Sequence, residues 1–124
     1  GRRERLRLEQ AEVLGRAIRE QAALAVVAGD LNAGPGSAPL QALEPLRSAH
    51  LAANGAEPAR TVGWSGPDQP GQVLDYILVS PGISVIDCNV AFAGRDSRAT
   101  RASDHYGLVA TLALPPLPRP LKAR

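Results

Sequence analysis

Three short segments of the sequence, GDLN, LDY and SDH, place polar side chains at the end of, or inside, stretches that otherwise predict buried strands. Carboxylate, carboxamide and imidazole groups can move protons and stabilise developing charge. Each segment alone also fits a plain structural role, because Asp, Asn and Ser commonly satisfy the backbone of their own turns. Three such segments in a chain with few other polar strand residues favour a functional site, formed by Asp30, Asn32, Asp75, Asp104 and His105.

The elements that must position these groups follow from hydrophobic patterning. Residues 2–20 place apolar side chains on one face with a 3.6-residue period, which predicts an amphipathic surface helix. The apolar run at 22–28 shows no alternation, so we expect a strand buried on both faces. A polar loop at 30–36 follows, and Ser37 is predicted to cap a short helix with Pro39 in its first turn.

Three further strands are predicted at 72–80, 83–92 and 106–114. In the first of them, strict alternation places the acidic Asp75 on a face that is otherwise apolar. We expect these strands and the one at 22–28 to share one sheet, with the helix on one face and apolar surface exposed on the other.

Residues 50–71 are irregular apart from a strand of two or three residues expected near Thr61. Long loops of this kind are often functional. His50 has no carboxylate partner nearby in the sequence, so we interpret it as a surface residue. Trp64 is equally compatible with packing of the long loop and with substrate contact. We interpret Cys88 as a small core residue.

The order of the motifs, GDLN after AVVA, then LDYILVS, then SDHYGLVATL, resembles the C-terminal half of the endonuclease/exonuclease/phosphatase superfamily of metal-dependent phosphoester hydrolases. The leading amphipathic helix also fits the helix that precedes the GDxN strand in that family. The resemblance implies an α/β (α+β) fold over residues 1–114, the C-terminal half of a four-layer α/β/β/α sandwich with mixed sheets and flanking helices. Residues 115–124 predict a proline-rich basic tail that leaves the domain as an extended segment.

The resemblance also implies that part of the active site lies outside this sequence. The family's metal-binding Glu, an Asn near it and a His just before the amphipathic helix have no counterpart here, and the sequence starts at Gly1. We therefore expect the chain to be part of a longer polypeptide and to need the N-terminal half of the same domain as its partner.

For the residues that are present, the resemblance implies separate roles. Asp30 would hold or deprotonate water or assist the leaving group, and Asn32 would donate its amide to a phosphate oxygen. Asp75 would orient His105 and stabilise its charged form. Asp104 would coordinate the metal directly or through another ligand, and oxygen-rich ligands of this kind suit Mg²⁺ or Mn²⁺.

The substrate implied by the resemblance is a phosphodiester, either a phospholipid headgroup or a nucleic acid. Arg95, Arg98 and Arg101 precede the SDH motif and form either a solvated loop or contacts to a substrate phosphate. The spacing from LDY to SDH, the GDLN form and the few aromatic rings resemble neutral sphingomyelinases and related bacterial phosphodiesterases most. The alternatives are a DNA endonuclease or exonuclease of the same superfamily, and a non-catalytic remnant that acts as an interaction module.

The composition limits other functions. One cysteine excludes an internal disulfide, and with two histidines no zinc cluster of thiolates and imidazoles can form. The formal net charge of +2 gives only a weak indication of nucleic-acid binding. Aromatic residues make up 3% of the chain, fewer than proteins that stack single-stranded bases usually need. No apolar run approaches the ~18 residues of a membrane span.

Overall fold

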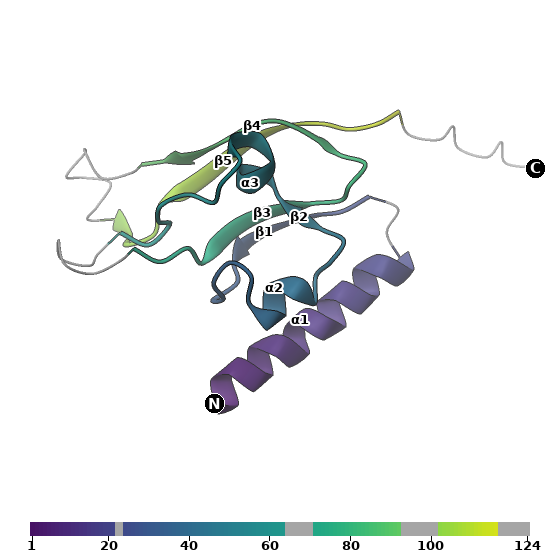
Figure 1. Cartoon of the computed structure of the whole chain (residues 1–124), viewed down its shortest axis with the longest axis vertical. Helices are drawn as coiled ribbons and strands as arrows, with labels where there is room; N and C mark the ends of the chain where they lie inside the picture. The colour runs from purple at the N-terminus through teal and green to yellow at the C-terminus, as the bar shows by residue number, and fades with distance from the viewer. Residues whose placement is uncertain (22–23, 64–70, 93–101, 117–124) are drawn as a thin grey trace, which may run out of the picture.

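The computed structural model describes residues 1–21, 24–63, 71–92 and 102–116 (Figure 1). It combines helices with antiparallel sheets, which confirms the predicted α+β class. The elements are α1 (Arg2–Gln21), β1 (Val26–Asp30), α2 (Ala38–Gln41), β2 (Arg47–Ser48), α3 (Ala49–Asn54), β3 (Asp75–Val79), β4 (Ser84–Ala91) and β5 (Gly107–Ala113). Within these ranges, every helix is too short or too polar to cross a membrane.

Helix α1 ends one residue beyond the predicted helix and packs against α2 and the turn that follows it. Gly15 approaches this turn so closely that a Cβ atom would overlap the carbonyl oxygen of Ala42. Arg19 reaches over the same turn, where its Nη1 donates to the carbonyls of Ala42 at 3.1 Å and Glu44 at 2.9 Å. The helix is therefore held by this close backbone approach and by Ala11 and Ile18, whereas the other large apolar residues of its predicted apolar face are exposed: Leu6, Val13 and Leu14.

The described strands form two sheets, one with the order β1-β3-β2 and the other with β4 paired to β5. The prediction that the four long strands share one sheet is therefore wrong. Strand β3 is central, and β1 and β2 occupy both of its edges. Since β3 offers no free edge, β4, the next strand in the chain, pairs with β5 instead. All of these pairs are antiparallel, so the part of the chain described here contains no parallel pair of the mixed sheets implied for the whole sandwich.

Strand β1 differs in position and burial from the strand predicted at 22–28. It starts at Val26 and runs to Asp30, which is thus the last residue of a strand and not the first of a loop. Val27 packs into a core, whereas Val26 on the opposite face is 48% exposed. The expected burial on both faces is wrong because only the face that carries Val27 is covered by helix α1.

Strand β3 separates two hydrophobic cores. Tyr76 and Leu78 pack on the side of α1 and α2, while Ile77 and Val79 pack on the side of α3 and β4. In Figure 1, α1 and α2 accordingly lie on one side of the three-stranded sheet and the β4–β5 ribbon on the other. The predicted alternation within β3 is confirmed. Only Val73, which precedes the strand, packs on the side opposite to the one predicted.

The short helices differ in how they begin. Ser37 occupies the predicted cap position of α2, with Pro39 in the first turn, but its hydroxyl makes no capping hydrogen bond. Its Oγ is buried without a hydrogen-bond partner. Helix α3 is capped by Ser48, whose Oγ accepts from the N–H of Leu51 at 3.3 Å. Cys88 lies in the second core, as predicted.

Apolar side chains are exposed on strands of both sheets, whereas the sequence predicted such exposure for one face of a single four-stranded sheet. The large apolar side chains exposed on or beside β1, β4 and β5 are Val26, Ile86, Phe92, Val109 and Leu114.

Replacing Gly15 by Ala should destabilise the fold, because the added methyl group must displace the backbone of Ala42. Overpacking costs about 1–3 kcal/mol, and the higher helix propensity of Ala offsets about 1 kcal/mol of this. Urea unfolding measures the difference. Glu12→Ala, at an exposed position of the same helix, is the control and should change the free energy of unfolding by about 0.5 kcal/mol or less. A raised midpoint for Gly15→Ala would contradict this close contact.

Candidate active site

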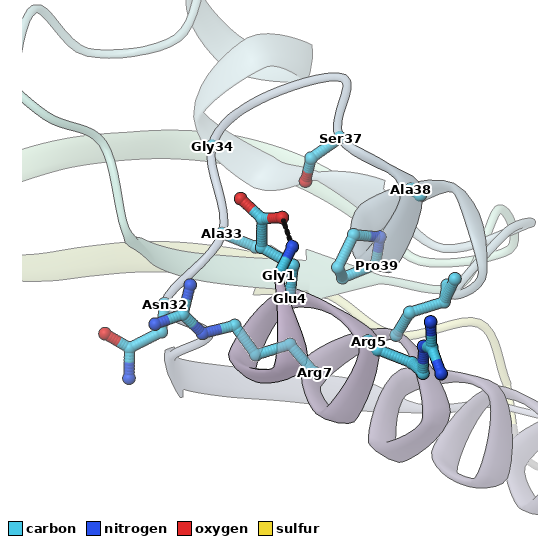
Figure 2. A pocket seen from close by; sticks show the side chains of 11 residues that line it. Gly1, Glu4, Arg5, Arg7, Asn32, Ala33, Gly34, Ser37, Ala38 and Pro39 are labelled. Atoms are coloured by element: carbon cyan, nitrogen blue, oxygen red, sulfur yellow. Dashed lines mark hydrogen bonds and ion pairs between the residues drawn. The ribbon is translucent and has the colours of Figure 1, made fainter.

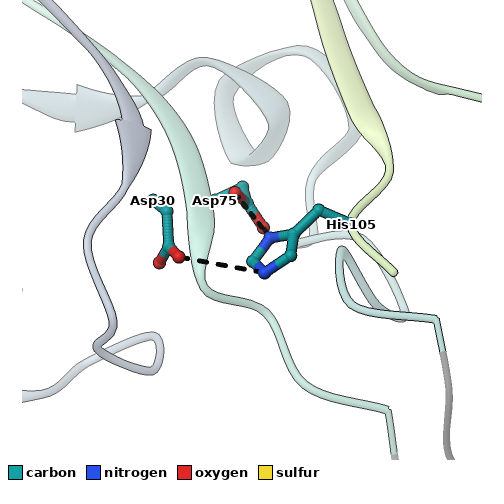
Figure 3. A group of neighbouring side chains, drawn as sticks. All are labelled: Asp30, Asp75 and His105. Atoms are coloured by element: carbon teal, nitrogen blue, oxygen red, sulfur yellow. Dashed lines mark hydrogen bonds and ion pairs between the residues drawn. The ribbon is translucent and has the colours of Figure 1, made fainter. Parts of the chain in front are cut away.

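Strands β1 and β3 bring two carboxylates together at one end of the first sheet. Their register pairs Asp30 directly with Asp75, so both side chains lie on the same face. His105 lies just before β5 of the other sheet, and its ring lies beside both carboxylates (Figure 3). Residues from three separate parts of the sequence thus form one group.

The His105 ring lies between the two carboxylates. Its Nδ1 is 2.9 Å from Oδ2 and 3.1 Å from Oδ1 of Asp75, and since a carboxylate only accepts, Nδ1 carries the hydrogen. Its Nε2 lies 3.8 Å from Oδ2 of Asp30, beyond a hydrogen bond but close enough for this carboxylate to attract the charged form of the ring. The side chain of Asp75 is 16% exposed, against 32% for His105 and 37% for Asp30. The shielded Asp75 therefore holds the ring, and Asp30 remains accessible.

The surrounding carboxylates raise the pKa of His105 above its usual value. The hydrogen bond to Asp75 is the main cause, burial opposes it, and the charges of Asp75, Asp30 and Asp104 add to it. The imidazolium form is therefore favoured, and the ring can carry positive charge beside an anionic group or donate a proton.

A short segment, residues 61–63, connects the His105 region to the approach of β3. Val62 forms isolated β-bridges to both Gln72 and His105. The N–H of Gly63 donates to the carbonyl of Asp104 at 2.6 Å. The strand predicted near position 61 is thus present as these bridges, and it links the two sheets at the site.

The turn after β1 places Asn32 next to Asp30. Asn32 has a φ of 49°, in the left-handed region that Asn tolerates, and its N–H donates to Oδ1 of Asp30 at 2.8 Å. One carboxylate oxygen therefore stabilises the turn, while the other faces His105. The buried Tyr76, which the sequence indicated only as a core residue, holds this loop through a hydrogen bond from its hydroxyl to the Ala33 carbonyl at 2.8 Å.

Asp104 lies apart from the group of Asp30, Asp75 and His105, whose ligand atoms are within 4.8 Å of one another. Its side chain is exposed, and within the described ranges it contributes to this group only through its charge. Its predicted metal-binding role stays a prediction. The described residues do not include Trp64 or the three arginines that are predicted to bind substrate, Arg95, Arg98 and Arg101.

A family model described as the Endonuclease/Exonuclease/phosphatase family matches residues 1–105. The chain belongs to this family. Among solved structures it is similar to the endonuclease/exonuclease/phosphatase from Bacteroides vulgatus, with 25% identity and a TM-score of 0.69 over 90% of this chain and 45% of that one. No curated protein matches the sequence significantly.

Two further solved structures share the fold. One is a functionally unknown conserved protein from Enterococcus faecalis V583, with 24% identity and a TM-score of 0.72 over 90% of this chain and 46% of that one. The other is an endonuclease/exonuclease/phosphatase family protein from Leptotrichia buccalis C-1013-b, with 21% identity and a TM-score of 0.61 over 80% of this chain and 41% of that one. The chain thus spans a little under half the length of these relatives.

Two clefts of this endonuclease/exonuclease/phosphatase family member lie beside the turn that follows β1, and the smaller of them reaches Asp30. One, of about 600 Å³, lies between the first turns of α1 and the loop after β1 (Figure 2). The other, of about 200 Å³, is lined in addition by Asp30. Arg7 and Asn32 line both clefts, and the half-buried Arg7 side chain extends toward Asn32 (Figure 2). A guanidinium beside the turn that holds Asp30 favours an anionic ligand.

The donor set fits a hard divalent cation. Mg²⁺ in proteins takes one or two carboxylates and keeps several waters, so it does not need a full cage of side chains. Asp30 offers an accessible carboxylate oxygen, whereas Nδ1 of His105 is engaged by Asp75. Of this group, Asp30 therefore has the oxygen best able to meet a cation, while the ring of His105 is held by Asp75.

The raised pKa of His105 predicts a specific pH dependence of stability. A pKa raised on folding adds stability that is fully present below the unfolded value of about 6.5 and is lost as pH rises through the folded value. Asp75→Asn should remove most of this component, so its free energy of unfolding should fall less than that of the unaltered chain as pH rises above about 6.5.

Urea unfolding at a series of pH values measures this difference. His105→Gln should show the same loss of pH dependence, and Asp87→Asn, which removes a carboxylate on β4 away from the group, should retain it. Equal slopes for the unaltered chain and Asp75→Asn would mean that Asp75 does not raise the pKa of His105.

Proposed function

We propose that this protein is a metal-dependent phosphoester hydrolase that cleaves a phosphodiester by attack of water. The observation that carries the proposal is the His105 ring between the carboxylates of Asp75 and Asp30. Membership of the endonuclease/exonuclease/phosphatase family supports hydrolysis of phosphoesters at the level of the superfamily.

Each residue has a separate task in the proposed reaction. Asp75 holds His105 with its proton on Nδ1 and stabilises the imidazolium, which leaves Nε2 for the substrate side. There the ring would stabilise charge on a phosphate oxygen or exchange a proton with it. Asp30, which lies 3.8 Å from Nε2, would orient or deprotonate water or assist the leaving group. Asn32 would donate its amide to a phosphate oxygen.

The proposed cofactor is Mg²⁺ or Mn²⁺, and its proposed ligand is Asp104 or the separately placed Asp30. Asp30 supports this with an accessible oxygen, and Asp104 with an exposed carboxylate next to His105 in the chain. When bound, such a cation polarises the phosphoryl oxygen and neutralises the charge that develops on it.

The proposed substrate is a phosphodiester of the sphingomyelin type, with a DNA nuclease as the alternative. The motif spacing and the few aromatic rings support the lipid preference. The clefts beside Asn32 carry Arg7, which would bind a phosphate of either substrate, and the same role is proposed for Arg95, Arg98 and Arg101.

We propose that the catalytic unit is part of a longer polypeptide. The chain covers 45% and 46% of two of the solved structures that it resembles, and its strands expose large apolar side chains that a second half of the domain would cover. We therefore direct the functional experiments at the natural polypeptide that contains this segment.

That polypeptide should hydrolyse bis-p-nitrophenyl phosphate with Mg²⁺ or Mn²⁺, and EDTA should abolish the reaction because it removes the cation. Release of phosphocholine from sphingomyelin micelles tests the lipid preference, and nicking of supercoiled plasmid tests the nuclease alternative. If DNA is cleaved faster than sphingomyelin, the nuclease alternative is favoured over the lipid preference. If none of the three substrates is hydrolysed with either metal, the non-catalytic interaction module is favoured.

His105→Ala should lower kcat by about 10²- to 10⁴-fold with little change in KM, because a positioned acid or base acts mainly in the transition state. Arg7→Ala and Arg98→Ala should mainly raise KM, since each removes a charge-assisted hydrogen bond worth about 1–3 kcal/mol. Steady-state kinetics separate the two effects. His50→Ala, outside the acidic group, is the matched control and should leave both constants unchanged. A His105→Ala variant that keeps most of its kcat would overturn the proposed roles.

A further inference from the structure

Thr61 and Ser80 are the buried polar side chains of the described part of the chain, and Thr61 is completely buried. Its Oγ1 accepts two backbone hydrogen bonds, from the N–H of Leu74 at 2.9 Å and from that of Asp75 at 3.1 Å. A hydroxyl oxygen has two acceptor lone pairs, so both are in use. The Thr61 side chain therefore fixes the backbone at the start of β3, where the Asp75 carboxylate is attached.

The peptide groups of Thr61 make two further hydrogen bonds. Its N–H donates to the Gln72 carbonyl at 2.8 Å, and its carbonyl accepts from the N–H of Tyr106 at 2.7 Å. Tyr106 directly follows His105 in the chain. One residue is thus bonded to the backbone on both sides of the Asp75–His105 pair.

This link matters because β3 and β5 belong to different sheets. The ladder between β1 and β3 sets Asp75 against Asp30 but does not include His105. The 2.9 Å hydrogen bond from Nδ1 to Asp75 must therefore be aligned by something other than a shared ladder, since such bonds weaken steeply with poor geometry. Thr61 provides a direct connection between the two partners.

We propose that Thr61 is the positioning residue of the Asp75–His105 pair: its hydroxyl sets the backbone of Asp75, its carbonyl sets that of Tyr106, and together they keep the His105 proton on Nδ1. The catalytic consequence of this role rests on the proposed hydrolase function. The positioning itself does not, because the location of the ring proton can be measured without substrate.

Two substitutions separate the hydroxyl from the shape of the side chain. Thr61→Val keeps the shape but leaves the N–H groups of Leu74 and Asp75 without their acceptor. Thr61→Ser keeps the acceptor and loses only a methyl group. A role through hydrogen bonding predicts that Val disrupts the pair and Ser preserves it, whereas a role through packing alone predicts the reverse order.

The test is the ring ¹⁵N chemical shifts of the histidines, recorded on the 124-residue chain at a pH where the imidazoles are neutral. These shifts report which nitrogen carries the proton. The chain has two histidines, and the half-buried His50 makes its own bond from Nδ1 to the Ala56 carbonyl at 2.7 Å, so it is an internal control. In the unaltered chain and in Thr61→Ser, the His105 proton should stay on Nδ1. In Thr61→Val it should redistribute toward Nε2, with His50 unchanged.

Hydrogen exchange of the Leu74 and Asp75 amides shows whether the hydroxyl bonds are lost in each variant. If these amides lose protection in Thr61→Val while the His105 shifts stay as in the unaltered chain, the proposal is wrong. A Thr61→Ser variant that behaves like Val overturns it as well. Should the valine variant not fold, Thr61→Ala, which leaves room for water at the two amides, takes its place, and an unchanged His105 tautomer would again overturn the proposal.

Kinetics on the natural polypeptide separate this inference from the proposed function. If hydrolysis is found, Thr61→Val should lower kcat with little change in KM, and Thr61→Ser should restore it. If no hydrolysis is found but the ¹⁵N shifts follow the expected pattern, the positioning role stands and the hydrolase function fails.

Discussion

The pairing of Asp30 with Asp75 across β1 and β3 is the constraint on which the site depends. Like charges directly opposite each other in an antiparallel pair are destabilising, so this register requires a positive partner. His105 provides that partner from outside the sheet, and its raised pKa reflects the same compensation. Because backbone ladders hold both carboxylates, the group is organised before any ligand binds.

Strand β3 serves two cores and the site at once. Tyr76 and Leu78 attach it to the helix layer of α1 and α2, Ile77 and Val79 attach it to α3 and the β4–β5 ribbon, and Asp75 stands at its first position. Tyr76 extends this role, since its hydroxyl holds the loop that follows Asp30. A strand paired on both edges and packed on both faces has little freedom to move, which is the property that the proposed catalytic role of the Asp75–His105 pair would need.

The carboxylates and the imidazole could be predicted because they stand at strand ends, where a polar residue contrasts with the local pattern. Asp75 is the clearest case, since alternation put it on an apolar face and the structure keeps it there, paired with His105. The division into two sheets could not be predicted in this way. It depends on β2, a strand of two residues, which occupies the second edge of β3. The role of Thr61 was also hidden, because it lies in a segment without periodicity and acts through backbone groups distant in sequence.

Two buried hydroxyls hold β3 near its opposite ends. Thr61 binds the amides at its start, and beyond its end the Oγ of Ser80 accepts from the N–H of Ala25 at 2.7 Å and donates to its carbonyl at 3.2 Å. A slip of one residue along β1 would turn Asp75 to the opposite face, and because side chains alternate with a period of two, no arrangement lies between these states. A mutation that weakens either end of this strand therefore does not change a distance gradually. It changes the fraction of molecules in which the strand has the correct register, and homologues with weakened ends would differ in this fraction.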